Sequence, residues 1–184
     1  VFPSSVNGNG LTNPVRVDNS LLYTSPSFGG FAITGFFSNN VSGQEDSGDN
    51  AKNTSMYSVL GQYQNSGLNV GANYHYIASG SSGTAAAIEK IQNFTLGASY
   101  DFKVVKISGV YSWNEIDYTV STQKRAELNN FLIGASVPFG NWTAKASYVY
   151  SDGKQFGDSQ QLAVGLNYDL SKRTDIYTAY SFIN

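Results

Sequence analysis

PVRVDNSLLYTSPSFGGFAITGFFS, residues 14–38, alternates apolar and polar side chains on both sides of a short break. From Val15 to Thr24 the apolar side chains recur in steps of two. They therefore share one face of an extended strand, because successive strand side chains point to opposite faces. Pro26 and the two glycines after it interrupt the pattern, which resumes at Phe31. The stretch predicts an antiparallel hairpin with one apolar face and one polar face.

The same alternation returns along the rest of the chain. It predicts eight further strands, in residues 55–64, 68–77, 94–102, 105–113, 131–139, 143–150, 161–170 and 175–183. A tight turn joins the two strands of each hairpin. The connections between these hairpins are long and polar, at residues 39–54, 78–92, 115–127 and 151–159. Short turns at one end and long loops at the other are typical of outer-membrane barrels.

The chemistry of the two faces indicates which one points outward. The polar face consists mainly of Asn, Ser, Thr, Gln, Lys and Gly, which are poorly suited to fill a core. A small soluble barrel would place its apolar face inside. The sequence therefore predicts an all-β fold, a transmembrane antiparallel up-and-down β-barrel of ten strands, with the apolar face toward lipid and the polar face toward a lumen.

Composition agrees with this fold and excludes several function classes. The chain has 184 residues, a net charge of −2, no cysteine and a mean hydropathy of −0.24. No basic surplus is present to bind nucleic acid, and no disulfide framework is possible. No stretch approaches the roughly 18 apolar residues of a membrane helix, but alternating strands do not need one. The 13 tyrosines and 19 glycines suit β-hairpins with aromatic girdles.

The aromatic side chains fall into two predicted rows, as expected at the two interfaces of a membrane. The row near the short turns comprises Tyr23, Tyr63, Tyr100, Phe102, Phe139, Trp142 and Tyr168. The row near the long loops comprises Tyr57, Tyr76, Tyr111, Trp113, Tyr150, Tyr180 and Phe182.

Two motifs carry a family resemblance. The opening stretch contains RxDNSxxYxSPxFxGF from Arg16 to Phe31, and the chain closes on YDLSKRTDIYTAYSFIN from Tyr168 to Asn184. Both resemble the general, trimeric, sixteen-stranded outer-membrane porins of Gram-negative bacteria, the Neisseria and Burkholderia type especially. In that family the first motif follows the constriction loop, and the second forms the last periplasmic turn and the penultimate strand.

The resemblance implies that residues 1–184 are an incomplete single porin domain. Five N-terminal strands, most of the constriction loop and the last strand would lie outside this sequence. An open sheet edge in lipid leaves backbone groups unpaired at several kcal/mol each. We therefore expect that the strands at 15–24 and 175–183 do not pair with each other in the native protein.

Five polar residues are candidates for the pore lining and its selectivity: Arg16, Asp18, Ser20, Lys106 and Lys145. The family places arginines near the position of Arg16, where charges across a narrowed lumen set selectivity. A solvated arginine paired with Asp18, which only anchors the loop, is the alternative. Lys106 and Lys145 are predicted to point inward in mid-strand, where they either line an anion path or balance carboxylates in the lumen.

The function implied by the resemblance is general diffusion of small hydrophilic solutes and ions, with a lean toward anions. The resemblance also implies a homotrimer in the outer membrane of a Gram-negative bacterium, in contact with lipid and lipopolysaccharide. We expect no reaction, no cofactor and no nucleic-acid partner. Two alternatives remain open at this stage: a ten-stranded outer-membrane protease-like barrel, and a soluble β-sandwich binding module.

Two groups of titratable residues are weaker candidates. His75 is the only histidine and is predicted to face inward, but it has no nucleophile or orienting carboxylate at a recognisable spacing. Glu45, Asp46 and Asp49 cluster in one long loop. They lack the regular spacing of an EF-hand calcium site, which favours a solvated loop.

Overall fold

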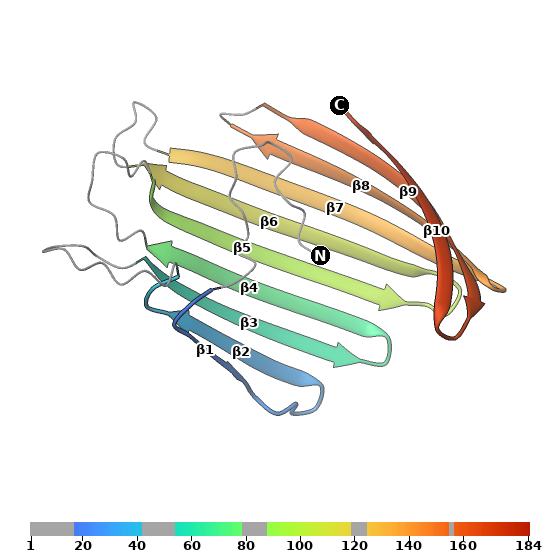
Figure 1. The fold of residues 1–184 in the computed structure, drawn as a ribbon, viewed down its shortest axis with the longest axis horizontal. Helices are drawn as coiled ribbons and strands as arrows, with labels where there is room; N and C mark the ends of the chain where they lie inside the picture. Colours follow the sequence, from blue (N-terminus) through green and yellow to red (C-terminus); the bar gives the residue numbers. More distant parts are fainter. Residues whose placement is uncertain (1–16, 42–53, 79–87, 119–124, 155–156) are drawn as a thin grey trace, which may run out of the picture.

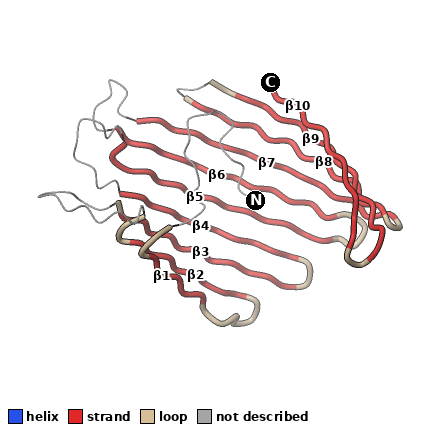
Figure 2. The backbone as a smooth tube through the Cα atoms, in the orientation of Figure 1, coloured by secondary structure: helices blue, strands red, loops and turns tan. Residues whose placement is uncertain are grey.

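The computed structural model describes residues 17–41, 54–78, 88–118, 125–154 and 157–184. These residues form one ten-stranded antiparallel sheet, shown in Figures 1 and 2. The strands are β1 (Ser20–Thr24), β2 (Phe31–Ser38), β3 (Ser55–Asn65), β4 (Leu68–Ala78), β5 (Ile88–Asp101), β6 (Lys106–Tyr118), β7 (Arg125–Phe139), β8 (Trp142–Gly153), β9 (Ser159–Ser171) and β10 (Thr174–Ile183). Within the described ranges, no helix is long and apolar enough to cross a membrane.

The strand order confirms the predicted up-and-down topology. Each strand pairs with its neighbour in the sequence, and the sheet runs from β1 to β10 without a crossover. β1 and β10 form the two edges of an open, curved sheet and do not pair with each other, as expected (Figure 1). The closed ten-stranded barrel that the protease alternative requires is therefore not formed by these strands.

The first hairpin has the predicted faces but a later start. Leu21 opposes Phe37 and Tyr23 opposes Gly35, so the apolar side chains share a face. The strand predicted from Val15 begins only at Ser20, because Asn19 adopts a positive φ of 49° that ends the extended backbone. Val15 and Arg16 lie outside the described residues.

Register fixes which side chains share a face across the whole sheet. Ala146 opposes Val164 on one side and Ala135 on the other, whereas Ser136 opposes both Lys106 and Lys145. The predicted apolar set Leu96, Ile133, Ala146 and Val164 lies on one face, and the predicted polar set Thr95, Lys106, Ser136, Lys145 and Gln161 lies on the other.

Val105, the remaining member of the predicted apolar set, lies in the turn before β6. No second sheet covers either face in the described ranges, which argues against a β-sandwich.

Three predicted loops are shorter than expected. Residues 88–92 belong to β5, and residues 115–118 and 125–127 belong to β6 and β7. Residues 151–153 and residue 159 belong to β8 and β9. The sequence pattern placed all of them in the connections because their polar side chains break the expected alternation. The strands therefore extend beyond the apolar band, and their long-loop ends carry a different surface.

Both aromatic rows are present on the apolar face. At the short-turn end, ring centroids lie 4.5 Å apart in the Tyr100–Phe102 and Trp142–Tyr168 pairs. Toward the long loops, the Tyr111 and Phe131 rings lie 5.0 Å apart. Such tilted pairs are favourable beyond their buried area, and the Tyr111–Phe131 and Trp142–Tyr168 pairs also join neighbouring strands.

Candidate functional site

The two predicted lysines of the lumen lie on the polar face at one level. Lys106 on β6 and Lys145 on β8 both oppose Ser136 of the intervening strand β7, so their side chains flank it. Both lysines are exposed. Asp101 opposes Lys106 on the other side. Lys106 opens β6 and Lys145 is near the start of β8, so the expectation that they stand in mid-strand is wrong: they lie toward the short turns.

The candidates near the start of the chain lie elsewhere. Ser20 opposes Ser38 at the long-loop end of the first hairpin. Asp18 is exposed and precedes the strand, and its backbone carbonyl accepts a 2.7 Å hydrogen bond from the Ser38 hydroxyl. Its N–H donates to the carbonyl of Val41 at 3.4 Å. The structure thus anchors the approach to β1 and does not bring Asp18 or Ser20 beside the two lysines. Arg16 lies outside the described residues.

A row of hydrogen-bonded neutral side chains crosses the polar face nearer the long loops. Asn93 donates to the Asn114 side-chain oxygen at 2.8 Å, and Asn130 donates to the Ser112 hydroxyl at 3.2 Å. The Ser151 hydroxyl in turn donates to the Asn130 oxygen at 2.6 Å. Sequence reasoning identified the polar face but missed this row, because the row depends on register between strands.

His75 lies beside this row. It is half-buried, opposite Ser58 on β3 and Asn93 on β5. These neighbours offer neither a nucleophile poised for attack nor an orienting carboxylate. The acidic cluster Glu45, Asp46 and Asp49, for which the sequence favours a solvated loop over a calcium site, lies outside the described residues. Elsewhere in the described ranges, no group of three His, Cys, Asp or Glu side chains could hold a metal.

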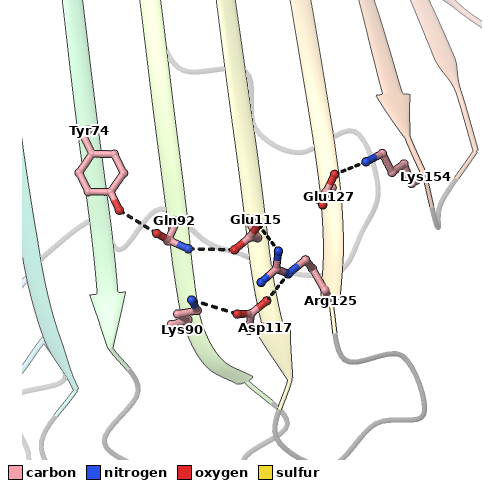
Figure 3. A network of polar contacts seen from close by, with 8 residues as sticks. All are labelled: Tyr74, Lys90, Gln92, Glu115, Asp117, Arg125, Glu127 and Lys154. Atoms are coloured by element: carbon pink, nitrogen blue, oxygen red, sulfur yellow. Dashed lines mark hydrogen bonds and ion pairs between the residues drawn. The ribbon is translucent and has the colours of Figure 1, made fainter.

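A network of charged and polar side chains occupies the apolar face at its long-loop end (Figure 3). The Tyr74 hydroxyl donates to Gln92 at 2.8 Å, and Gln92 donates to Glu115 at 2.9 Å. Arg125 then joins two acids of β6: its Nη1 lies 3.1 Å from Glu115 and its Nε lies 3.0 Å from Asp117. These contacts link β4, β5, β6 and β7.

Two lysines complete this network, which we call the outer rim network. Lys90 Nζ lies 3.1 Å from Asp117, and Lys154 is paired with Glu127. The hydrogen bond from Lys154 to Glu127, together with the charge of that carboxylate, raises the pKa of the Lys154 ammonium. The sequence pattern does not indicate this network, because all of its members except Tyr74 lie in segments that the pattern predicts as loops.

At the level of the outer rim network, the other face of the sheet changes from polar to apolar side chains. Ile91 opposes Ile77 on β4 and Ile116 on β6, and Ile116 opposes Ala126, which is buried. These apolar side chains lie on the face that carries polar side chains nearer the short turns. On β6 the outward side chain changes from Trp113 to Glu115 in one step of two residues. The apolar band of the outer surface therefore ends between those two residues.

The sheet has a continuous apolar outer band with aromatic rows and a hydrophilic opposite face. These features define the wall of a transmembrane β-barrel with a polar lumen. The model of the Gram-negative porin family matches residues 2–184. This chain belongs to the Gram-negative porin family.

Relatives and solved structures support the assignment. The chain is 26% identical over 208 residues to an outer membrane porin protein of Bordetella pertussis, covering 95% of this chain and 54% of that protein. It is 28% identical over 179 residues to outer membrane porin protein 32 of Delftia acidovorans, covering 93% of this chain and 47% of that protein. The chain thus spans about half the length of the curated relatives it matches.

Among solved structures, the anion-selective porin from Comamonas acidovorans superposes with a TM-score of 0.77 at 25% identity, over 91% of this chain and 49% of that one. Another porin superposes with a TM-score of 0.74 at 19% identity, over 90% of this chain and 56% of that one, which shows the shared fold. Both superpositions confirm the expected fold class.

The family assignment also confirms two further expectations. The chain is an outer-membrane protein of Gram-negative type, and its family comprises channels, not enzymes. With the family shown, the apolar face is the lipid-facing face and the polar face is the lumen face.

Proposed function

We propose that this chain forms part of the wall of a general diffusion porin that passes small hydrophilic solutes and ions. The observation that carries the proposal is the hydrophilic lumen face, which lacks a charged or nucleophilic cluster suited to chemistry among the described residues and exposes its lysines to solvent. Residues 1–184 contribute ten strands to a larger, sixteen-stranded barrel that assembles as a homotrimer. The matched relatives, about twice as long, support a barrel larger than these ten strands.

The proposed selectivity is a lean toward anions. Lys106 and Lys145 present two ammonium groups at one level of the lumen, and only Asp101 opposes one of them in register. Fixed charges along a water-filled path attract counter-ions within a Debye length, about 8 Å at physiological salt. The resemblance to an anion-selective porin points the same way. We propose that Arg16 contributes to this selectivity at the constriction, with Asp18 and Ser20 near it in sequence.

Reversing these charges is expected to move ion selectivity toward cations. In planar bilayers at low salt, Arg16→Glu in the full-length protein should shift the reversal potential toward cation preference, and Lys106→Glu with Lys145→Glu should do so as well. The shift should shrink in molar salt, where the screening length falls to about 3 Å. Lys172→Glu, in the exposed turn before β10, serves as the control.

The two sites are tested separately by this experiment. An unchanged reversal potential in Arg16→Glu would leave Arg16 as a loop anchor. An unchanged potential in the double lysine variant would limit those lysines to balancing lumen carboxylates. Absence of any ion conductance in the unmodified full-length protein would refute the porin function itself.

A further inference from the structure

We propose that the lumen face of β6, β7 and β8 binds organic anions that carry an apolar body, of the class of the aromatic carboxylates. This inference rests on the proposed function, because it requires the polar face to line a water-filled pore, and it names one solute class for that pore. The observation that carries it is an apolar strip in the lumen wall, made of Val110, Leu132 and Val149, on the same face as the two lumen lysines.

The apolar strip crosses three neighbouring strands at one level. Leu132 of β7 opposes Val110 of β6 on one side and Val149 of β8 on the other, and all three side chains are half-buried. The strip ends at Gly97 of β5 and at Gln161 of β9. From Val110 to Val149 it spans two interstrand spacings, about 10 Å. A strip of this length offers room for one aromatic ring with a short side arm.

Apolar side chains are costly on the wall of an aqueous channel. The lumen of a water-filled outer-membrane barrel is ordinarily polar, and apolar surface left in water is unfavourable. Polar or small residues border the strip on both sides, toward the long loops Ser112, Asn130 and Ser151, and toward the short turns Ser108, Gly134 and Ser147. A contiguous apolar patch within a polar surface marks a contact site.

Two cations lie below the strip. Lys106 precedes Val110 by four residues on β6, and Lys145 precedes Val149 by four residues on β8, so each lysine shares the face of its valine. The separation is roughly 14 Å at about 3.4 Å per residue, and the flexible lysine stem bridges part of it. A solute that lies along the strands therefore places an anionic head on the lysines and an apolar body on the strip.

The two lysines are available to an anion. Both are exposed, and they are the only charged side chains on the lumen face over the described lengths of β6, β7 and β8. Asp101 opposes Lys106, but its carboxylate accepts a 2.7 Å hydrogen bond from the Lys103 N–H. Neither lumen lysine forms an ion pair with a described residue. The charge beside the strip is therefore positive, which favours an organic anion over an organic cation or a neutral amphiphile.

The test is a titration of the full-length protein in planar bilayers with sodium 4-phenylbutyrate, read as the concentration that halves the chloride current. Butyrate lacks the ring and 4-phenylbutanamide lacks the charge, so each should require a roughly tenfold higher concentration. Lys106→Gln with Lys145→Gln should remove the difference between 4-phenylbutyrate and its amide.

A shape-preserving variant tests the strip without a loss of packing volume. Val110→Thr with Val149→Thr exchanges two methyl groups for hydroxyl groups and should raise the half-blocking concentration roughly 15-fold, at about fourfold per methyl group. Val59→Thr with Val137→Thr makes the same exchange on the lipid-facing face and should leave that concentration unchanged. Equal block by butyrate and 4-phenylbutyrate, or unchanged block in the Val110 and Val149 variant, would overturn the proposal.

Labelling of Leu132→Cys tests whether another part of the full-length protein covers the strip. In the intact barrel this thiol should react with a charged methanethiosulfonate reagent, and 4-phenylbutyrate should slow the reaction. Protection of the thiol in the absence of 4-phenylbutyrate would show that the strip is covered, and would overturn the proposal. Chloride conductance reports separately on porin function: its absence would refute the channel, whereas conductance without preference for the aromatic anion would refute this site alone.

Discussion

Replacing Val164 with arginine is expected to lower the free energy of unfolding of the intact barrel by about 2–4 kcal/mol. Val164 lies near the middle of β9, on the lipid-facing face between Ala146 of β8 and Tyr180 of β10. An arginine there would have to lose its hydration in the hydrocarbon layer or distort the bilayer around it. Urea-dependent unfolding in liposomes, monitored by tryptophan fluorescence, measures the change.

The control is Gln161→Arg on the same strand. Gln161 lies on the lumen face, opposite Val149 and Ile183, where a guanidinium remains in water. Its free energy of unfolding should stay close to that of the unmodified protein. If instead Gln161→Arg were the costly change and Val164→Arg the harmless one, the assignment of the two faces would be reversed.

Gly30→Ala is expected to cost about 2–4 kcal/mol of unfolding free energy. Gly30 closes the first hairpin at a φ of 90°, where an L side chain is strained. A Cβ at this position would also overlap the backbone carbonyl of Gln64. The Gln64 N–H donates to the Gly30 carbonyl at 2.8 Å, so neither backbone can withdraw without losing that hydrogen bond.

The neighbouring Gly29→Ala separates strain from overlap. Gly29 has a φ of 60°, and a Cβ there would have no atom within 4 Å. Its replacement should cost only about 1 kcal/mol, the strain of the left-handed region. Equal losses for the two variants in urea unfolding would show that the contact with Gln64 contributes nothing.

The faces of the strands could be predicted because lipid imposes a strict pattern on this fold. Every second side chain within the apolar band must be apolar, so a step of two residues is visible in stretches such as Leu162 to Leu170. The closing turn and the order of strands followed from the same pattern. The resemblance of residues 16–31 to porins added the function, which alternation alone does not identify.

The strand ends could not be predicted in the same way, because polarity inverts where the strands leave the apolar band. Lys90, Glu115 and Arg125 are outward-facing strand residues that resemble loop residues by composition. One signal of the longer strands is present in the sequence. Ile77, Ile91 and Ile116 keep the alternation of apolar and polar side chains, but there the apolar side chain points inward. Cross-strand pairs in the network also require the register, which one sequence does not reveal.

The beginning of β1 was mispredicted for a local reason. The alternation from Val15 to Thr24 contains Asn19, a residue type that tolerates positive φ. Hydrogen bonds from the Ser38 hydroxyl to the Asp18 carbonyl and from the Asp18 N–H to the Val41 carbonyl then fix the backbone of Asp18 ahead of β1. Contacts with residues distant in the sequence therefore outweigh the strand propensity of the residues just before β1.

Single-cysteine labelling tests most directly whether this chain is the wall of a water-filled pore. The sequence contains no cysteine, so each introduced thiol is unique within it. Ser136→Cys and Lys145→Cys lie on the lumen face, whereas Ile133→Cys and Ala146→Cys lie on the lipid-facing face. In the intact barrel in liposomes, a charged methanethiosulfonate reagent should modify the first two and lower their conductance, and should leave the other two unmodified. Rapid modification of the thiols at positions 133 and 146, with protection at 136 and 145, would contradict the account.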